Sequence, residues 1–258
     1  VYGGTVIDSI LATNGATYGG GASHADLINC VVTGNGAIWR GGGALFCNLR
    51  GCLVSGNVIG FYSGPADGSG LDACNSVENC TIVGNRSQSG VGRAVVGTSS
   101  TLMNCIVYNN EVGNYDSSVT MSHCCTYPAV EEGEGNITNA PQFADAPNGD
   151  FHLSASSPCI NAGTNQPWMS NAVDLDGNMR IAGAAVDMGA YEFGGEPGPG
   201  PGSGTGGATL SYSDLIQPSS VRYVWADGCL AQDSPNDPWI RKVYYGPDNQ
   251  QGHFVMVF

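Results

Sequence analysis

Carboxylates and arginines are the residues of this 258-residue chain whose chemistry could act on a polysaccharide. Glycoside cleavage needs two carboxylates that face each other across about 5–10 Å. The first half of the chain offers five acidic candidates: Asp8, Asp26, Asp67, Asp72 and Glu78. They do not recur in a clustered arrangement. We therefore interpret each of them as a solvated turn residue rather than as half of a catalytic pair.

Other catalytic patterns are also missing from the sequence. The G-H-G and R-x-K elements of polygalacturonases are absent, and so is a G-x-S-x-G nucleophile motif. A pectate-lyase mechanism needs a basic residue beside bound calcium, and no Asp cluster adjoins the candidate arginines, which are Arg40, Arg50, Arg86 and Arg93. The four histidines, His24, His123, His152 and His253, share no common spacing. The sequence thus predicts that the chain is not an enzyme and has no cofactor.

One short segment leaves a metal site open. In DLDGN (174–178), Asp174, Asp176 and Asn178 alternate around Gly177, as at the start of a calcium loop. The closing acidic residue of such a loop is missing at the required offset. An Asx turn held by hydrogen bonds explains the segment equally well, so both interpretations stand.

Ten cysteines require an explanation. Zinc sites use paired C-x-x-C spacing, which this chain lacks. Buried Cys behaves as a small hydrophobic residue, and this is the interpretation we favour for most of them. For Cys47 and Cys74 a disulfide between neighbouring coils is an alternative, and the pairing of Cys159 and Cys229 stays open.

Composition narrows the class of protein. Lys and Arg number 8 against 22 Asp and Glu, which gives a net charge of −14 and excludes the basic face that nucleic acids or anionic lipids require. No apolar run approaches the ~18 residues that span a bilayer. Forty glycines argue against a helical protein, because each interior Gly costs about 1 kcal/mol relative to Ala.

A repeat runs through the first half of the chain. Five segments align with an apolar residue first, Cys or a small residue fourth, an apolar residue sixth and Asn ninth: 6–14, 27–35, 49–57, 77–85 and 102–110. Their ninth residues are Asn14, Asn35, Asn57, Asn85 and Asn110, separated by 21, 22, 28 and 25 residues. A weaker sixth copy at 121–129 lacks the Asn, and Gly-Gly-Gly-Ala occurs at 19–22 and 41–44.

This repeat predicts an all-β, right-handed parallel β-helix over residues 1–193, with about six to eight coils stacked about 4.8 Å apart. Like residues then lie above like residues. Cys30, Cys52, Cys80 and Cys105 should form an interior column. The five asparagines should form a ladder of amides that hydrogen-bond along the stack.

The repeats also resemble a known group of proteins. GNGAIWRGGGAL (34–45) and the following strands resemble the glycine-rich repeats of polymorphic outer-membrane proteins and related parallel β-helices. The blocks at 135–164 and 174–193 resemble the C-terminal end of secreted bacterial β-helix proteins that carry an anchoring module. The resemblance implies a β-helix in a secreted or cell-surface protein, with these two blocks completing the last coils and closing the helix.

The sequence changes after Phe193. Residues 194–207 form a Gly/Pro-rich linker, and residues 208–258 read as a small β-rich module with four strands, at 209–213, 221–226, 239–245 and 253–258. This module would anchor, sort or donate a strand. Phe254, Met256 and Phe258 alternate as one apolar face, so the last strand could add to a neighbouring molecule and build a head-to-tail filament.

Three functions are compatible with these features. The first is a secreted or cell-surface structural or adhesive protein that self-associates or is anchored. The second is a carbohydrate-active enzyme of the polysaccharide lyase or glycoside hydrolase type, and the third is a carbohydrate-binding module. The last would display a row of exposed aromatics, and the candidates in the repeats are Trp39, Phe46, Phe61 and Tyr62. The sequence favours the first.

Overall fold

The computed structural model of the chain describes residues 1–60, 67–111, 113–198, 242–244 and 255–257, the last two ranges as backbone only. The chain divides into two compact units, Val1–Gly198 and Pro199–Phe258. In the described residues there is no α-helix, and two short 3-10 helices accompany the strands. The first unit therefore carries its function on strands and turns.

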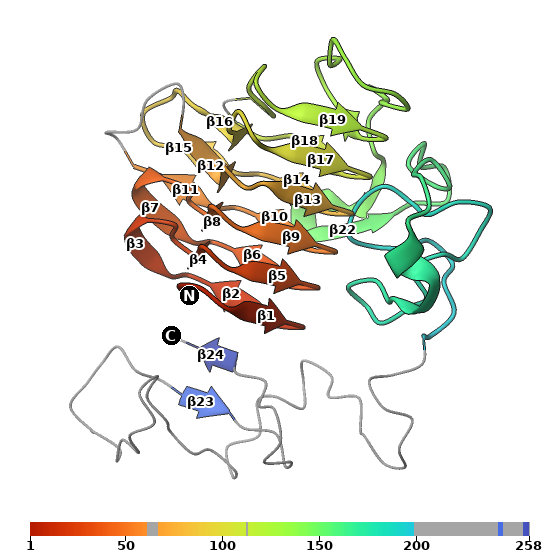
Figure 1. Cartoon of the computed structure of the whole chain (residues 1–258), viewed down its shortest axis with the longest axis horizontal. Coiled ribbons are helices and arrows are strands. Elements are labelled where there is room, and N and C mark those ends of the chain that lie inside the picture. Colours follow the sequence, from red (N-terminus) through yellow and green to blue (C-terminus); the bar gives the residue numbers. More distant parts are fainter. Residues whose placement is uncertain (61–66, 112, 199–241, 245–254, 258) are drawn as a thin grey trace. The chain divides into compact units, whose positions relative to one another are not determined.

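Four parallel sheets run along the first unit, and each strand pairs with the equivalent strand of the next turn (Figure 1). The first sheet contains β1 (Thr5–Ile7), β5 (Asp26–Ile28), β9 (Asn48–Arg50), β13 (Ser76–Glu78), β17 (Thr101–Met103) and β19 (Thr120–Ser122). The second contains β2 (Ile10–Ala12), β6 (Val31–Thr33), β10 (Leu53–Ser55), β14 (Thr81–Val83), β18 (Ile106–Tyr108) and β20 (Cys125–Thr126).

The other two sheets have four strands each. The third contains β3 (Gly15–Tyr18), β7 (Gly36–Arg40), β11 (Val58–Ile59) and β15 (Arg86–Ser87). The fourth contains β4 (Ala22–Ser23), β8 (Ala44–Leu45), β12 (Gly68–Asp72) and β16 (Arg93–Val96). Together the sheets form a parallel β-solenoid, as the repeat predicts, although it has about five turns rather than six to eight.

The register matches the sequence repeat residue by residue. Leu27 pairs with Leu49, and Leu49 pairs with Val77, so the first residues of the repeats lie above one another. The sixth residues do the same, as Val32 pairs with Val54. Because every turn buries the same apolar positions, one continuous core runs through the stack.

Residues with positive φ form the corners of each turn. The third residue of the repeat has φ between 47° and 63° in every copy, in Asp8, Asn29, Gly51, Asn79, Asn104 and His123. Asn, Asp and Gly tolerate this left-handed conformation better than other residues. The close approach of backbones explains the glycine triplets, because a Cβ on Gly42 would lie 2.3 Å from the carbonyl oxygen of Ser69.

The asparagine ladder is present inside the corner between the second and third sheets. Each Oδ1 accepts the main-chain N–H and the Nδ2–H of the Asn one turn earlier, at 2.9–3.0 Å. Asn114 continues the ladder beyond Asn110, with an N–O distance of 3.2 Å from the Asn110 main chain. The sequence repeat did not identify Asn114, because it lies outside the ninth position.

The predicted cysteine column is present as well. The main-chain N–H of Cys30, Cys52 and Cys80 each donates to the sulfur of the next cysteine, at 3.4–3.5 Å. Cys124, from the sixth copy, ends the column. Cys47 and Cys74 are free thiols, so the disulfide alternative is wrong, and all nine described cysteines are free and buried. Cys229 lies outside the described residues.

The last turn is covered before the chain leaves the stack. Asn136 Oδ1 accepts the N–H of Cys124 at 2.9 Å, and Ile137 bridges to Cys125 in parallel. Beyond this point the expectation that residues 135–164 and 174–193 complete the last coils is wrong. Residues 138–198, which we name the flank segment, lie beside the sheets instead (Figure 1).

The flank segment has little regular structure. It contains an antiparallel hairpin and two 3-10 helices: β21 (Phe143–Asp145), η1 (Ala146–Asn148), β22 (Asp150–Leu153) and η2 (Pro167–Asn171). Hydrogen bonds attach it to the solenoid, since Asn104 Nδ2 donates to the oxygen of Thr164 at 3.0 Å and the N–H of Ala190 donates to Thr81 Oγ1 at 3.0 Å. Its repeat-free sequence cannot pair as another coil, which explains the smaller number of turns.

In the second unit the structure describes β23 (Lys242–Tyr244) and β24 (Val255–Val257), which pair antiparallel. They lie within the predicted strands 239–245 and 253–258. The predicted strands 209–213 and 221–226 lie outside the described residues. The boundaries that we predict at 193/194 and 207/208 stay predictions.

Candidate functional site

Four of the five carboxylates that the sequence offered for catalysis lie against neighbouring side chains. Asp72 is fully buried and accepts hydrogen bonds from both Nη2 and Nε of Arg40, at 2.5 and 3.1 Å. Asp67 lies 3.7 Å from Arg40 Nε. Burial raises the pKa of the Asp72 carboxyl, although the hydrogen bond from Arg40 opposes this. The pair thus fastens one turn of the solenoid to the next.

Two of the remaining acids in the repeats, Glu78 and Asp26, also have partners. Glu78 lies 3.3 Å from Arg50, whose guanidinium is 4.3 Å from the centre of the Trp168 ring. Asp26 accepts a hydrogen bond from Asn48 Nδ2 at 2.7 Å. Asp8 is an exposed corner residue, Arg93 donates to the oxygen of Gly92, and Arg86 begins β15 as an exposed side chain.

An aromatic row stands out on the exposed corner between the fourth and first sheets. It consists of Tyr2, His24 and Phe46, one from each of three successive turns, with ring centres 5.1 and 5.0 Å apart. Tyr2 is 80% exposed and Phe46 is 42% exposed. The row presents aromatic surface along the direction in which the turns stack.

Polar groups lie near the aromatic row. Arg40 lies 6.0 Å from the centre of the Phe46 ring, a cation–π distance. Asp26 and Asn48 follow the row two residues after His24 and Phe46, and both are exposed. The row therefore combines ring faces with hydrogen-bond donors and acceptors.

Backbone strain accompanies the aromatic row. Phe46 has φ of 52°, which is rare for a bulky residue, and His24 has φ of 56°, which His adopts more often. The equivalent residue one turn later is Ala73, at φ of 48°. The corner thus tolerates Ala, and the two rings are held in a strained backbone without filling the core.

The sequence pointed to only part of this row. Phe46 was a candidate as an exposed aromatic, whereas Tyr2 was not considered and His24 was noted only among the histidines, because nothing in the sequence places the three at one corner. Trp39 is exposed on β7, next to Arg40, rather than in the row. Phe61 and Tyr62 lie outside the described residues.

A second polar group forms on the flank segment. We name it the His152 cluster, and it comprises Asp150, His152, Asp176 and Tyr191. Asp150 Oδ1 lies 2.5 Å from His152 Nδ1, and Asp176 Oδ2 lies 2.6 Å from His152 Nε2. The Tyr191 ring centre is 4.1 Å from that of His152. Burial opposes the charged form of His152, but the hydrogen bonds to both carboxylates outweigh it and raise its pKa.

The sequence contains a partial signal for this cluster. Asp150 and His152 are two residues apart on β22, so a strand places them on the same face. Asp176 belongs to the candidate calcium turn. Asp174 in that turn accepts the N–H groups of Asp176, Asn178 and Glu192, at 3.0, 2.8 and 2.8 Å. Carboxylate oxygens of Asp174 that accept main-chain N–H groups are typical of an Asx turn. In a calcium loop the same oxygens would face the cation instead.

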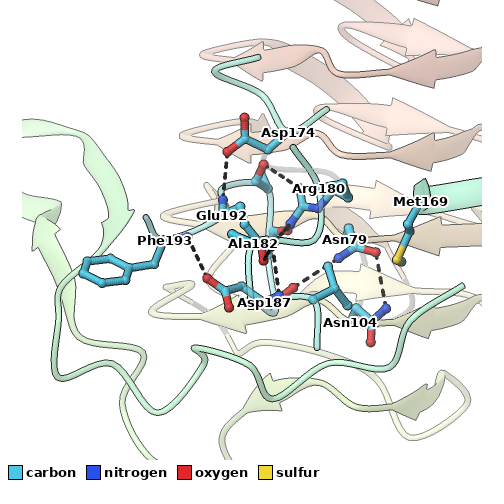
Figure 2. Close-up of polar contacts among 12 residues, drawn as sticks. Asn79, Asn104, Met169, Asp174, Arg180, Ala182, Asp187, Glu192 and Phe193 are labelled. Carbon is cyan, nitrogen blue, oxygen red and sulfur yellow. Dashed lines mark hydrogen bonds and ion pairs between the residues drawn. The ribbon is translucent and has the colours of Figure 1, made fainter. Parts of the chain in front are cut away.

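Buried charges hold the His152 cluster in place. Figure 2 shows the Arg180 network, which consists of Arg180, Asp174, Asp187 and Glu192, all of them buried. Arg180 donates to the oxygens of Gly189 and Ala190 and lies 3.6 Å from Glu192. Asp174 lies two residues before Asp176, and Glu192 directly follows Tyr191. The network therefore fixes the two chain segments that bring Asp176 and Tyr191 to His152.

The carboxylates of the Arg180 network accept main-chain N–H groups. Glu192 accepts those of Ala182 and Asp187, and Asp187 accepts that of Phe193 at 2.7 Å (Figure 2). Three acids share one Arg, and burial together with the charge of Asp187 raises the pKa of Glu192 to about 7. The network contacts the solenoid through Asn79 Nδ2, which donates to the oxygen of Asp187 at 3.2 Å.

Neither a metal cluster nor a spanning helix occurs in the described part of the chain. Within it, no group of three or more His, Cys, Asp or Glu side chains is arranged to hold a metal ion. The same residues include no helix of the length and apolarity needed to cross a membrane.

Comparison with protein-family models, curated proteins and solved structures found no match to this chain. The resemblance to secreted bacterial β-helix proteins therefore stays a prediction.

Proposed function

We propose that this chain is a secreted or cell-surface structural and adhesive protein, in which a rigid solenoid displays a binding surface. The observation that carries the proposal is the aromatic row. The side chains that recur in every turn are used inside, as asparagine and cysteine ladders, whereas Tyr2, His24 and Phe46 face outward. An exposed aromatic surface on a rigid scaffold is typical of a binding face.

The free thiols are compatible with this location. Disulfides form in oxidising compartments, and reactive thiols there would be oxidised. All nine described cysteines are buried. Burial raises the pKa of Cys74, Cys80 and Cys124 well above the ordinary value, whereas at Cys52 and Cys105 burial is outweighed by hydrogen bonds with neighbouring thiols, which lower the pKa. Burial in the core keeps oxidants away from all nine sulfurs.

Surface labelling tests the location. Intact cells that produce the protein would be treated with a protease or an antibody against residues 1–198, with a cytosolic protein as control. We expect the protein to be accessible on intact cells or released into the medium. Recovery in the cytosolic fraction alone would contradict the proposal.

Head-to-tail assembly into a filament is the finer form of this proposal. The second unit contains paired short strands, and a strand can add to the sheet edge of a second copy. Such a contact does not close on itself, so it propagates. Light scattering and electron microscopy of the full chain and of a chain lacking residues 208–258 would test it. Equal, monodisperse monomers in both samples would leave an anchoring role for this module.

A carbohydrate-active enzyme is the second candidate, and the His152 cluster favours it. Asp150 and Asp176 are exposed in part and lie on either side of an imidazole. Carboxylates and His can act as proton donors and acceptors. Release of reducing sugar from plant and bacterial polysaccharides would test this, with Asp176→Asn as the variant. Activity that this substitution abolishes would establish the enzyme and displace the adhesive proposal.

A further inference from the structure

The aromatic row has the geometry of a polymer-binding ridge rather than of a pocket. Its three rings come from three successive turns and follow one another at 5.1 and 5.0 Å. They are tilted by 41° and 47° to one another, so each ring offers part of its face along the ridge. A ligand that uses all three rings must itself extend along the stacking direction.

Polar side chains beside the rings indicate the chemistry of that ligand. The C–H face of a sugar ring is apolar and packs on an aromatic face, whereas its hydroxyls point sideways to hydrogen-bonding groups. Asp26 and Asn48 follow His24 and Phe46 by two residues and hydrogen-bond to each other, and Arg40 lies 6.0 Å from the centre of the Phe46 ring. Exposed rings with polar side chains nearby therefore suit a chain of sugars.

Charge separates two classes of polysaccharide. The chain has a net charge of −14, and Arg40 is already bound to Asp72 and Asp67. A polyanion would meet repulsion from the whole protein and no available cation at Arg40. A neutral polysaccharide meets neither obstacle.

The position of the rings supports a role outside the core. His24, Phe46 and Ala73 occupy the same corner at positive φ in three successive turns, and Ala73 shows that the corner does not require a ring. A bulky residue gains little for stability there, since its ring is exposed. The exposed rings, and not the backbone conformation that other corners share, therefore distinguish this corner.

We propose that Tyr2, His24 and Phe46 bind a neutral polysaccharide that lies along the solenoid. The proposal rests on the adhesive function above and names its ligand class. Each sugar would stack on one ring. Its hydroxyls would donate hydrogen bonds to the Asp26 carboxylate and exchange hydrogen bonds with the Asn48 amide.

Affinity electrophoresis of the full chain tests this inference. Native gels would contain hydroxyethylcellulose or a galactomannan as neutral polymers, and polygalacturonate as the polyanion. We expect retardation by at least one neutral polymer and none by polygalacturonate. Phe46→Ala should weaken the apparent Kd about tenfold, and Tyr2→Ala should weaken it severalfold.

Two further variants keep the test decisive. Phe193→Ala removes a ring of matched exposure, 43%, from the flank segment and should leave retardation unchanged. Phe46→Trp keeps a ring at the corner and should retain binding, which shows that loss in Phe46→Ala reflects the missing ring. No retardation by either neutral polymer, stronger retardation by polygalacturonate, or equal loss in Phe193→Ala would overturn the proposal. Surface labelling is independent of these results, so the two proposals can fail separately.

Discussion

The solenoid turns and the flank segment bury polar groups in different ways. Inside the turns most buried polar side chains are neutral and repeat, such as Asn35, Asn57 and Asn85, and the buried acid Asp72 is paired with Arg40. In the flank segment they are charged and unique, with Arg180 among three carboxylates. An amide ladder does not titrate, whereas a buried network with an excess of acids responds to pH.

The outer faces of the early and late turns also differ, because the flank segment covers only the late turns. In one column of the second sheet, Ile10 and Val31 are partly exposed on the first two turns, whereas Ile106 is fully buried. The flank segment covers the later turns, where the N–H of Ala190 donates to Thr81 and a Cβ on Gly189 would clash with Ile106. The early turns keep an open surface, and these are the turns that carry the aromatic row.

Removing the central cation should have the largest effect. Arg180→Ala leaves three buried carboxylates without their cation, and we expect a loss of about 3–5 kcal/mol in the stability of the flank segment. Hydrogen exchange and limited proteolysis should show residues 138–198 opening while the first two turns stay protected. Arg86→Ala, on an exposed arginine, is the control. Equal loss of protection in every turn would show that the two regions unfold as one.

A pH dependence follows from Glu192, whose pKa is raised to about 7 by burial and by Asp187. The folded protein binds this proton more tightly than the unfolded chain, whose Glu has a pKa near 4.5. The stabilisation is therefore complete below about pH 4.5 and is lost as the pH rises to about 7, at most roughly 3 kcal/mol. Urea unfolding across this range measures it.

The matched variant for this prediction is Glu192→Gln, which should flatten the dependence between pH 4.5 and 7. His152→Asn is the control, because the raised pKa of His152 acts above its ordinary value of 6.5. A slope that persists in Glu192→Gln would assign the proton to Asp187, whose pKa burial also raises.

The solenoid could be predicted from sequence because stacking imposes the same requirement on each turn. Leu27, Leu49 and Val77 share a position, so alignment of the chain with itself gives their register. The ladders followed from the same alignment. Tyr2 and His24 escaped it because corner residues outside the nine-residue segments vary from turn to turn.

The flank segment could not be predicted in this way. Arg180 and Glu192 meet through a fold that has no internal repeat, and hydrogen bonds to single main-chain groups fix it. Asp150 and His152 did carry a strand signal, but Asp176 and Tyr191 join them only in three dimensions. The resemblance of residues 135–164 and 174–193 to the C-terminal end of secreted β-helix proteins therefore predicted that the coils extend to residue 193. Residues 138–193 lie beside the sheets instead.

Breaking the amide ladder should have an intermediate effect. Asn57→Ala removes the acceptor for the N–H and Nδ2–H of Asn35 and a donor to Val32. Buried groups without partners cost about 1–3 kcal/mol, so urea unfolding should shift accordingly. Asn48→Ala, on the exposed face, is the control. The loss should be the same at pH 5 and pH 8, because no group in the ladder titrates, and a pH-dependent loss would contradict the contrast with the flank segment.

The sulfur column should give the smallest effect on stability and the sharpest test of burial. In Cys80→Ser the hydroxyl can take over both hydrogen bonds, accepting from the N–H of Cys52 and donating to the oxygen of Glu78, so we expect a loss of about 1 kcal/mol. Native labelling with a thiol reagent should be slow for Cys30, Cys52, Cys80 and Cys105, because the reagent must reach the sulfur and all four side chains are fully buried. Mass spectrometry of labelled peptides would locate each site, with denatured protein as the reference for full labelling. Cys125, which packs against the flank segment, and Cys159, which belongs to it, should label faster in Arg180→Ala than in the unaltered chain, while the column should not change. Rapid labelling of the column in the unaltered protein would contradict the solenoid register itself, because these sulfurs reach solvent only if the turns are wrongly stacked.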